Sequence, residues 1–344
     1  IRRFALLLLP LGFLAVMVAA PLLSLAFYDG EGAWAEVVAD DYMRLRLGWT
    51  VAQAVLTCVL VTALGVPAAW VLARMDFAGR RTVLRLLMLP FVMPTLVAGM
   101  GVLALFGAHG MLAAGWQDTP WLLIYGNVFF NLPVLVRSAY QGFVRVPQAR
   151  LLSAQSLGAD AWRRFIWVEW PVVRAWVAGG ACLVFLYCFS GFGLALLLGG
   201  ERFATVEVEI YRLVAYELDM ARASVLVWLV LAVTAAAGGL YAYWSRRVAV
   251  DKSVSPLPPR APIWAWEKWL TATVLTMLAV CCLLPLAAVW LKAVSAGSSW
   301  AVLLEAQTWA AVWNTVRFSA AAVAAATVLG VLYAAAARQM AWLR

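Results

Sequence analysis

The stretch SAQSLGADAWRRFIWVEWP, residues 153–171, is a polar interruption between two long apolar runs. It holds four charged residues, which are Asp160, Arg163, Arg164 and Glu169. Charges are scarce in the rest of the chain, because only 12% of all residues are Asp, Glu, Lys or Arg. Charged side chains avoid the hydrocarbon interior of a membrane. We therefore expect this stretch to lie at a membrane surface, between two spans.

The sequence predicts two short helices here, with a turn between them. Residues 148–157 are good helix formers. Gly158 suits the left-handed position that often follows a helix end. Asp160 is placed to cap a second helix over 161–170, which Pro171 closes or redirects.

The composition of the whole chain points to a membrane protein. Hydrophobic residues make up 65% of the 344 positions. A soluble globular chain has roughly 45–50% apolar and about 25% charged residues. One soluble core cannot bury this excess, so the bilayer must be the solvent for most of the chain.

Eight apolar runs are long enough to cross a bilayer. They cover residues 4–27, 48–73, 83–106, 121–140, 174–198, 223–244, 269–291 and 312–337. Helices are expected, because each backbone polar group in lipid must be paired within its own segment. The first run is interpreted as a retained span and not as a signal peptide. The predicted class is an all-α membrane protein with about eight transmembrane helices.

Basic residues fall mainly on one side of this arrangement. With the N-terminus in the cytoplasm, most of the 26 Lys and Arg residues lie in cytoplasmic segments. The positive-inside rule therefore predicts a cytoplasmic N-terminus and a cytoplasmic polar stretch. The net charge of +9 is then a topology signal. Membrane lipids are expected partners, and nucleic acid is not.

Several classes of function lack the residues that they need. The five cysteines all lie in apolar runs, and His109 is the single histidine, so a metal site or a histidine-based catalytic centre is not expected. The spans carry no cluster of carboxylates, which argues against an ion-coupled secondary transporter or a membrane enzyme. The chain has no Gly-rich phosphate loop, so energy is expected from a separate ATPase.

A weak internal repeat indicates a duplicated module. Residues 50–66 resemble residues 315–331 at a constant offset of 265. Chance matching of alanine-rich helices is the alternative. The predicted organisation is a first half at 1–250 with six spans, a linker at 251–266 and the beginning of a second half at 267–344 with two spans. The chain is then expected to be a fragment of a longer protein that continues past residue 344 and contains a second polar loop.

The polar stretch resembles the EAA loop of permease subunits of binding-protein-dependent ABC importers. In that pattern a Glu-Ala-Ala triplet is followed four residues later by glycine. A hydrophobic group that ends in proline lies thirteen residues beyond the glycine. The matching positions are Ala154, Gly158, Val168, Trp170 and Pro171. Three positions depart from the pattern: Leu152 replaces Glu, Ser153 replaces the first Ala, and Trp170 replaces Leu.

The resemblance implies an ABC importer type I permease-like fold, in which the loop over about 141–173 docks on a cytoplasmic ATPase dimer. ATP and Mg²⁺ would then belong to the ATPase, and this chain would need no cofactor. The residues implied in docking are Ala154, Gly158, Ala159, Asp160, Arg163, Arg164, Val168, Trp170 and Pro171. The alternative is an interfacial hairpin that only links two spans, with its tryptophans at the headgroups. Arg163 and Arg164 could equally pair with anionic lipid.

Three stretches resemble the thiamine branch of this family, whose members fuse two permease halves. They are NVFFNLP at 127–133, FIWVEWP at 165–171 and LLLGGERFATVEVEIYRLVAYELDMARAS at 196–224. The resemblance implies import of thiamine or thiamine pyrophosphate from a periplasmic binding protein across the bacterial inner membrane. Ferric iron or another small solute is the alternative substrate.

The charged segment at 199–222 is expected on the outer side of the membrane. Its acidic residues are Glu201, Glu207, Glu209, Glu217 and Asp219. In an importer of this kind they would form a docking surface for the substrate-loaded binding protein. A solvated loop without a partner is the alternative. Nothing in the sequence identifies the residues that contact the substrate.

Overall fold

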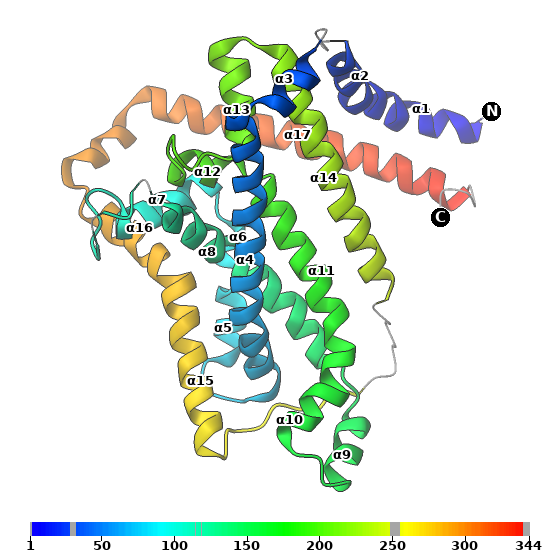
Figure 1. The fold of residues 1–344 in the computed structure, drawn as a ribbon, viewed down its shortest axis with the longest axis vertical. Coiled ribbons are helices and arrows are strands. Elements are labelled where there is room, and N and C mark those ends of the chain that lie inside the picture. Colours follow the sequence, from blue (N-terminus) through cyan, green and yellow to red (C-terminus); the bar gives the residue numbers. More distant parts are fainter. Residues whose placement is uncertain (1, 28–31, 114, 118, 248–254, 340–344) are drawn as a thin grey trace. The chain divides into compact units, whose positions relative to one another are not determined.

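The fold is described from a computed structural model over residues 2–27, 32–113, 115–117, 119–247 and 255–339. Most of these residues are helical, and the extended pairings among them are two isolated β-bridges. The chain forms two units (Figure 1). The larger unit is Trp34–Ala293, and the smaller unit combines Ile1–Ala33 with Val294–Arg344. The predicted all-α class is confirmed.

Seven helices among the described residues are long and apolar enough to cross a membrane. They are Leu8–Leu25, Asp41–Arg74, Pro120–Val144, Ala161–Phe189, Met220–Arg246, Ala265–Val294 and Ala306–Ala335. A bent pair, Arg80–Val92 with Thr95–Phe106, makes an eighth if it is counted as one span. Each predicted span therefore corresponds to helical structure, but two of them differ in shape from the prediction.

Four long helices make the centre of the larger unit (Figure 1). They are α4 (Asp41–Arg74), α8 (Pro120–Val144), α11 (Trp170–Phe189) and α14 (Met220–Arg246). Helix α4 packs on α8 and α11, and α11 also packs on α8 and α14. Glycine permits this close approach, since a Cβ at Gly65 would lie 2.8 Å from Leu135 Cδ2. The short helix α3 (Ala33–Ala39) precedes α4.

The run predicted as one span at 83–106 is broken. It forms α5 (Arg80–Leu86), α6 (Leu89–Val92) and α7 (Thr95–Phe106), and the two arms are bent by 103°. The bend lies at Pro94, whose ring disfavours a helical conformation in the residue before it. Met93 is accordingly extended, with φ −68° and ψ 147°. The prediction of a continuous span here was wrong.

The run predicted at 174–198 is also divided. Helix α11 ends at Phe189, and a separate short helix, α12 (Phe192–Leu198), follows. Helix α12 packs against α7 and α8. The three helices share a buried apolar cluster of Ala98, Val102, Leu122, Leu123, Phe129, Leu194, Ala195 and Leu198. Helix α12 is therefore a separate element packed on α7 and α8, which the apolar composition of the run did not distinguish from a continuation of α11.

The last helix of the larger unit contains a π-helical turn. Helix α15 (Ala265–Leu278) continues through η4 (Ala279–Leu283) into α16 (Leu284–Val294). Pro285 lies directly after this turn, and a π-helical turn accommodates the hydrogen bond that proline cannot make. The Tyr125 hydroxyl donates to the Val280 carbonyl at 3.0 Å, which ties the turn to α8.

The smaller unit pairs the two ends of the chain. Its elements are α1 (Arg2–Leu14), η1 (Ala15–Ala19), α2 (Ala20–Ala26), η5 (Gly297–Leu304) and α17 (Ala306–Gln339). Helix α1 packs on α17. Ala306, the first residue of α17, lies 265 residues after Asp41, the first residue of α4.

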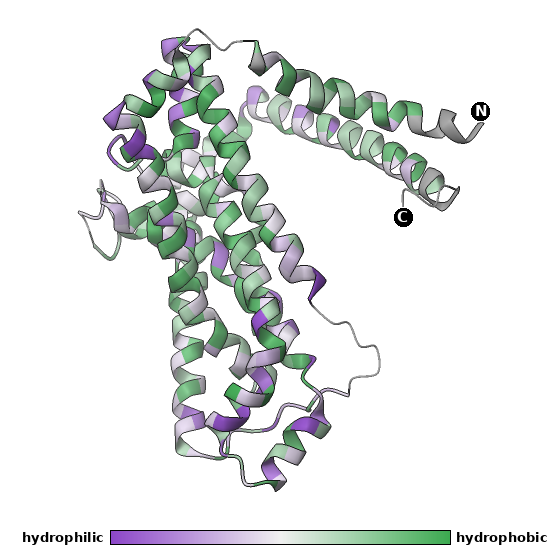
Figure 2. Cartoon of the chain, turned by 45° about the vertical axis from the view of Figure 1, so that its right-hand side comes forward, coloured by the Kyte–Doolittle hydropathy of each residue, from purple (hydrophilic) through white to green (hydrophobic). Residues whose placement is uncertain are grey.

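Hydropathy follows the long axis of the larger unit (Figure 2). Hydrophilic residues gather at its two ends, and the helices between them are mainly apolar. The two predicted sites lie at these opposite ends, with α9 (Gln148–Ser156) and α10 (Ala161–Arg164) at one and α13 (Val206–Arg212) at the other (Figure 1). Residues 251–254 of the predicted linker lie outside the described residues, and Ala265 and Trp266 already belong to α15.

Candidate functional site

The polar stretch forms a helical hairpin at one end of the larger unit. Helix α9 (Gln148–Ser156) ends at Leu157, and Gly158 follows with a positive φ of 79°. The Gly158 amide donates to the Gln155 carbonyl at 3.0 Å, and the Ala159 amide donates to the Ala154 carbonyl at 3.0 Å. This pair of bonds is the Schellman arrangement. The predicted first helix and its left-handed glycine are confirmed.

The second helix of the hairpin, α10 (Ala161–Arg164), begins with the predicted cap. The Asp160 carboxylate accepts a hydrogen bond from the Arg163 amide at 2.7 Å. The Arg164 guanidinium donates to Gln155 Oε1 at 3.1 Å and so ties α10 to α9. These contacts give the hairpin a defined shape that does not depend on a partner.

Pro171 does not close the second helix, and that prediction was wrong. The helix continues through the π-helical turn η2 (Phe165–Glu169) into α11, where Pro171 lies in the first turn. A π-helical turn before a proline accommodates the missing amide hydrogen. The hairpin is consequently joined to α11 without a break, and a displacement of α10 would be passed directly to that span.

The tip of the hairpin is apolar and exposed. The Leu157 side chain is 87% exposed, and Trp162 and Trp167 are also exposed. An exposed apolar group of this kind is typical of a contact surface. Four of the residues predicted to dock are exposed, namely Gly158, Asp160, Arg163 and Pro171. The other five are half-buried, namely Ala154, Ala159, Arg164, Val168 and Trp170. The hairpin therefore brings the whole predicted set together, but only part of the set faces outward.

A buried ion pair anchors the base of the hairpin to α4. The Arg74 guanidinium donates to Glu169 Oε1 at 2.8 Å from Nε, and it also donates to the Phe143 carbonyl at 3.1 Å. The Trp70 indole N–H donates to Glu169 Oε2 at 2.9 Å. Arg74 and Glu169 are both buried. Breaking such a pair from one side is costly, because the remaining charge is left without compensation.

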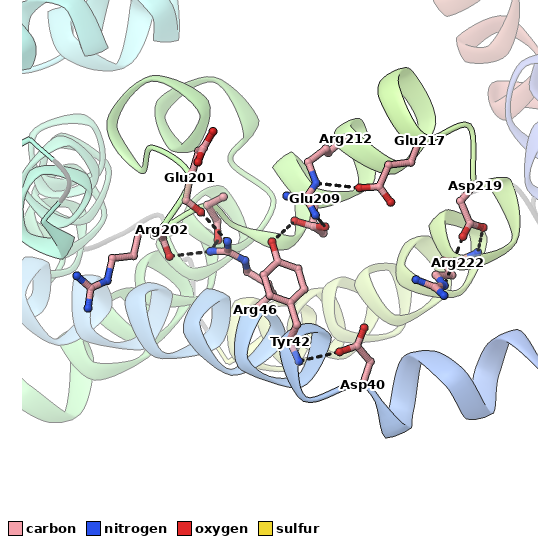
Figure 3. A network of polar contacts seen from close by, with 11 residues as sticks. Asp40, Tyr42, Arg46, Glu201, Arg202, Glu209, Arg212, Glu217, Asp219 and Arg222 are labelled. Carbon is pink, nitrogen blue, oxygen red and sulfur yellow. Dashed lines mark hydrogen bonds and ion pairs between the residues drawn. The ribbon is translucent and has the colours of Figure 1, made fainter.

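The charged segment at 199–222, predicted on the outer side and called the outer segment below, forms α13 (Val206–Arg212) and a π-helical turn, η3 (Leu213–Glu217) (Figure 3). Glu209 is only 2% exposed. It accepts a hydrogen bond from the Tyr42 hydroxyl at 2.9 Å and pairs with Arg212 at 3.0 Å. Arg212 also pairs with Glu217 at 3.2 Å. These residues therefore fasten the outer segment to the start of α4.

The remaining acidic residues have different surroundings. Asp219 caps α14 by accepting from the Arg222 amide at 3.0 Å, and it pairs with the Arg222 side chain at 3.4 Å. Burial raises the pKa of the Glu207 carboxyl. Glu201 is exposed, and its carbonyl accepts from Arg46. The predicted acidic set is thus brought together, but only part of it is a free negative surface, because Glu209, Glu217 and Asp219 pair with arginines.

Aromatic and apolar side chains face solvent beside these acidic residues. Tyr216 and Leu218 are each 73% exposed, and the Tyr211 and Tyr216 rings meet edge to face at 5.8 Å. Leu218 has a φ of 56°, a left-handed conformation that side chains other than glycine rarely adopt. The Asp219 amide donates to the Leu213 carbonyl at 3.0 Å and holds this turn closed. Strain of this kind clusters at functional surfaces.

Comparison with known proteins places this helical arrangement in a family. A family model described as "Binding-protein-dependent transport system inner membrane component" matches residues 62–250, which is more than half of the chain. The chain belongs to this family. The matched residues include the hairpin, its buried anchor and the outer segment. The chain is accordingly a multi-pass inner-membrane transport component.

Named relatives of this inner-membrane component are thiamine transport system permease proteins. The protein from Salmonella typhimurium is 32% identical over 95% of this chain and 61% of its own length. The protein from Escherichia coli is 31% identical over 95% of this chain and 63% of its own length. One from Brucella abortus is 35% identical over 66% of this chain and 44% of its own length. The chain thus spans less than two thirds of the length of these relatives.

A solved structure shares the fold of this inner-membrane component. It is a chain of a bacterial alginate ABC transporter in complex with an alginate pentasaccharide-bound periplasmic protein. The TM-score is 0.60 and the identity is 15%, over 71% of this chain and 94% of the other. The likeness at this identity is one of fold. It confirms the predicted permease-like fold.

The sequence analysis missed the buried anchor of the hairpin in this inner-membrane component. From the sequence, Glu169 is only one of four charges in the polar stretch, and Arg74 has no predicted role. A local signal exists, because Glu169 directly precedes an apolar run and Trp70 precedes Arg74 by one helical turn. The pairing itself joins residues 95 positions apart, so no local pattern could have shown it.

Proposed function

We propose that the chain is part of the transmembrane subunit of an ATP-driven importer. The subunit would take thiamine or thiamine pyrophosphate from a periplasmic binding protein and pass it across the inner membrane by alternating access. The assignment of the substrate rests on the similarity to thiamine transport system permease proteins over 95% of this chain. Membership of the binding-protein-dependent family supports the reaction class.

The hairpin of α9 and α10 is proposed to dock on a cytoplasmic ATPase dimer. Its apolar tip at Leu157 and Trp162 supports this role, because an ATPase groove would remove these side chains from water. The Schellman turn and the Arg74–Glu169 anchor favour transmission, since a stiff element transfers a displacement that a flexible loop would absorb. ATP and Mg²⁺ are assigned to the ATPase, and no cofactor is assigned to this chain.

The N-terminus and the hairpin are proposed to lie in the cytoplasm. The distribution of Lys and Arg between the loops supports this orientation. The segment with α13 and η3 would then face the periplasm. The end-to-end separation of the hairpin and α13 in the larger unit is consistent with this assignment (Figure 1).

The outer segment is proposed to receive the binding protein. Tyr216 and Leu218 would supply the contact, because exposed aromatic and apolar side chains are frequent energetic centres of interfaces. The predicted acidic residues would hold that surface in place through Glu209 and Asp219. This division of roles differs from the sequence-based hypothesis, in which the carboxylates themselves made the contact.

Stimulated ATP hydrolysis tests this function. The natural subunit that contains this chain is reconstituted in liposomes with its ATPase and its binding protein. Binding protein loaded with thiamine should stimulate hydrolysis, and binding protein loaded with ferric iron should not. Stimulation by the iron-loaded protein alone would favour the alternative substrate. No stimulation by the thiamine-loaded protein would contradict the proposal.

A further inference from the structure

Residues 255–264, here called the strap, link the hairpin to α4 by backbone hydrogen bonds. The Gln148 amide, at the start of α9, donates to the Ser255 carbonyl at 3.1 Å. The Arg260 amide donates to the Arg74 carbonyl at 3.0 Å, and the Asp76 amide donates to the Arg260 carbonyl at 2.8 Å. An unstructured linker between two parts of a protein makes no such fixed bonds.

The strap is also fixed to the first turn of α15. The Arg260 guanidinium donates to both carboxylate oxygens of Glu267, at 2.5 and 3.1 Å. The same carboxylate accepts from the amides of Ile263 at 2.9 Å and Trp264 at 3.2 Å. Glu267 is 2% exposed, so these bonds are protected from water. One buried carboxylate therefore joins the strap to the end of α15.

The composition of the strap favours stiffness. It contains four prolines, which are Pro256, Pro258, Pro259 and Pro262. Proline-rich segments adopt an extended form and act as semi-rigid spacers. A cavity of about 500 Å³ separates the strap from the hairpin over part of its length, with Gln155, Arg164 and Trp264 among its lining residues. Side chains do not fill this cavity. The backbone hydrogen bonds of the strap therefore connect it to the hairpin and to α4.

We infer that the strap is a second mechanical connection of the coupling hairpin. The strap transmits a displacement of α9 to α15. This inference rests on the proposed function. The first connection runs through the unbroken helix into α11 and through Glu169 to α4. The strap adds a connection to α15, because it joins the first turn of that helix to the hairpin (Figure 1). Arg260 and Glu267 are positioning residues in this connection.

The substitution Gln148→Pro cuts one anchor of the strap selectively. Gln148 is the first residue of α9, a position that tolerates proline because its amide makes no bond within the helix. The preceding Pro147 has φ −62° and ψ 129°, which a residue before proline favours. The variant therefore removes the bond to Ser255 and keeps the helix. Gln148→Ala changes the side chain and retains the bond, so it is the matched control.

The measurements are hydrogen exchange of the strap and solute transported per ATP hydrolysed, both in the reconstituted importer. Loss of one net hydrogen bond should raise opening of the strap about fivefold at the Arg260 amide, which donates to the Arg74 carbonyl. Transport per ATP should fall in Gln148→Pro and remain at the wild-type value in Gln148→Ala. Unchanged exchange in α9 would show that the helix is intact.

A second variant addresses the other end of the strap. Arg260→Gln with Glu267→Gln removes both charges together and leaves no unpaired charge, while glutamine can still accept at the helix start. It should lower transport per ATP as Gln148→Pro does. Equal transport per ATP in both variants and the wild type would overturn the inference, whether or not exchange increased. A wild type without stimulated hydrolysis would contradict the proposed function, and the inference with it.

Discussion

Gly158 and Glu169 show which residue roles are visible in a sequence. The role of Gly158 is local, because a glycine directly after a helix-forming run predicts a left-handed turn, and the structure has one with φ 79°. The role of Glu169 is not local, because its partners Trp70 and Arg74 come from another helix. Sequence patterns therefore predicted the shape of the hairpin and missed what holds its base.

Substitution of Gly158 tests the effect of its positive φ without a steric clash from the added side chain. Nothing lies within 4 Å of a Cβ built at Gly158, so no clash is expected. The positive φ alone should cost about 1–2 kcal/mol for an ordinary side chain and less for asparagine. Gly158→Val should lower the stimulation of ATP hydrolysis by loaded binding protein, and Gly158→Asn should retain most of it. Wild-type stimulation in Gly158→Val would refute the docking role of this turn.

Substitution of Glu169 tests the buried anchor. Glu169→Gln leaves Arg74 buried without its counter-charge, which should reduce the free energy of unfolding by about 3–5 kcal/mol. Thermal unfolding of the purified subunit in detergent measures this loss. Replacing both Arg74 and Glu169 by methionine should recover much of the stability, because no uncompensated charge remains. A Glu169→Gln variant as stable as the wild type would show that the pair contributes little.

At the scale of elements, three prolines of this chain show two different outcomes. At Pro94 the helix breaks and the two arms bend by 103°. At Pro171 and Pro285 the helix continues beside a π-helical turn. The number of helical spans was predictable from apolar length, but these outcomes were not. They depend on tertiary contacts, such as the bond from Tyr125 to Val280, that no local pattern contains.

The outer element gives a test of the docking surface. The double substitution Tyr216→Ser and Leu218→Ser removes two exposed side chains and leaves the Glu209–Arg212 pair in place. It should raise the binding-protein concentration for half-maximal stimulation by about tenfold, as expected when interface centres are lost. Glu201→Gln is the control, since an exposed rim charge has little effect on affinity. A larger effect in the control than in the double variant would restore the acidic-surface hypothesis.

At the scale of the whole molecule, the predicted duplication can be compared with the starts of two long helices. Helices α4 and α17 begin at Asp41 and Ala306, which are 265 positions apart, as are the two copies of the sequence repeat. A π-helical turn also occurs earlier in the chain than each of them, at η1 directly before α2 and at η4 directly before α16. The duplication remains a prediction, because a second hairpin has not been observed.

Membrane orientation can be measured by thiol labelling. In a variant without native cysteines, Ser156→Cys places a thiol in the hairpin and Glu201→Cys places one in the outer segment. Both positions are exposed. In intact cells a membrane-impermeant reagent should label position 201 and not position 156, and lysis should make position 156 reactive. The opposite pattern would place the N-terminus in the periplasm and refute the proposed topology.

The central claim is that the subunit containing this chain moves thiamine at the expense of ATP. Uptake of labelled thiamine into liposomes that contain the subunit and its ATPase, with binding protein added outside, measures this directly. The account predicts uptake that requires both ATP and binding protein and that the Gly158→Val substitution reduces. Uptake that proceeds without ATP, or no thiamine uptake alongside ATP-dependent uptake of another solute, would contradict it.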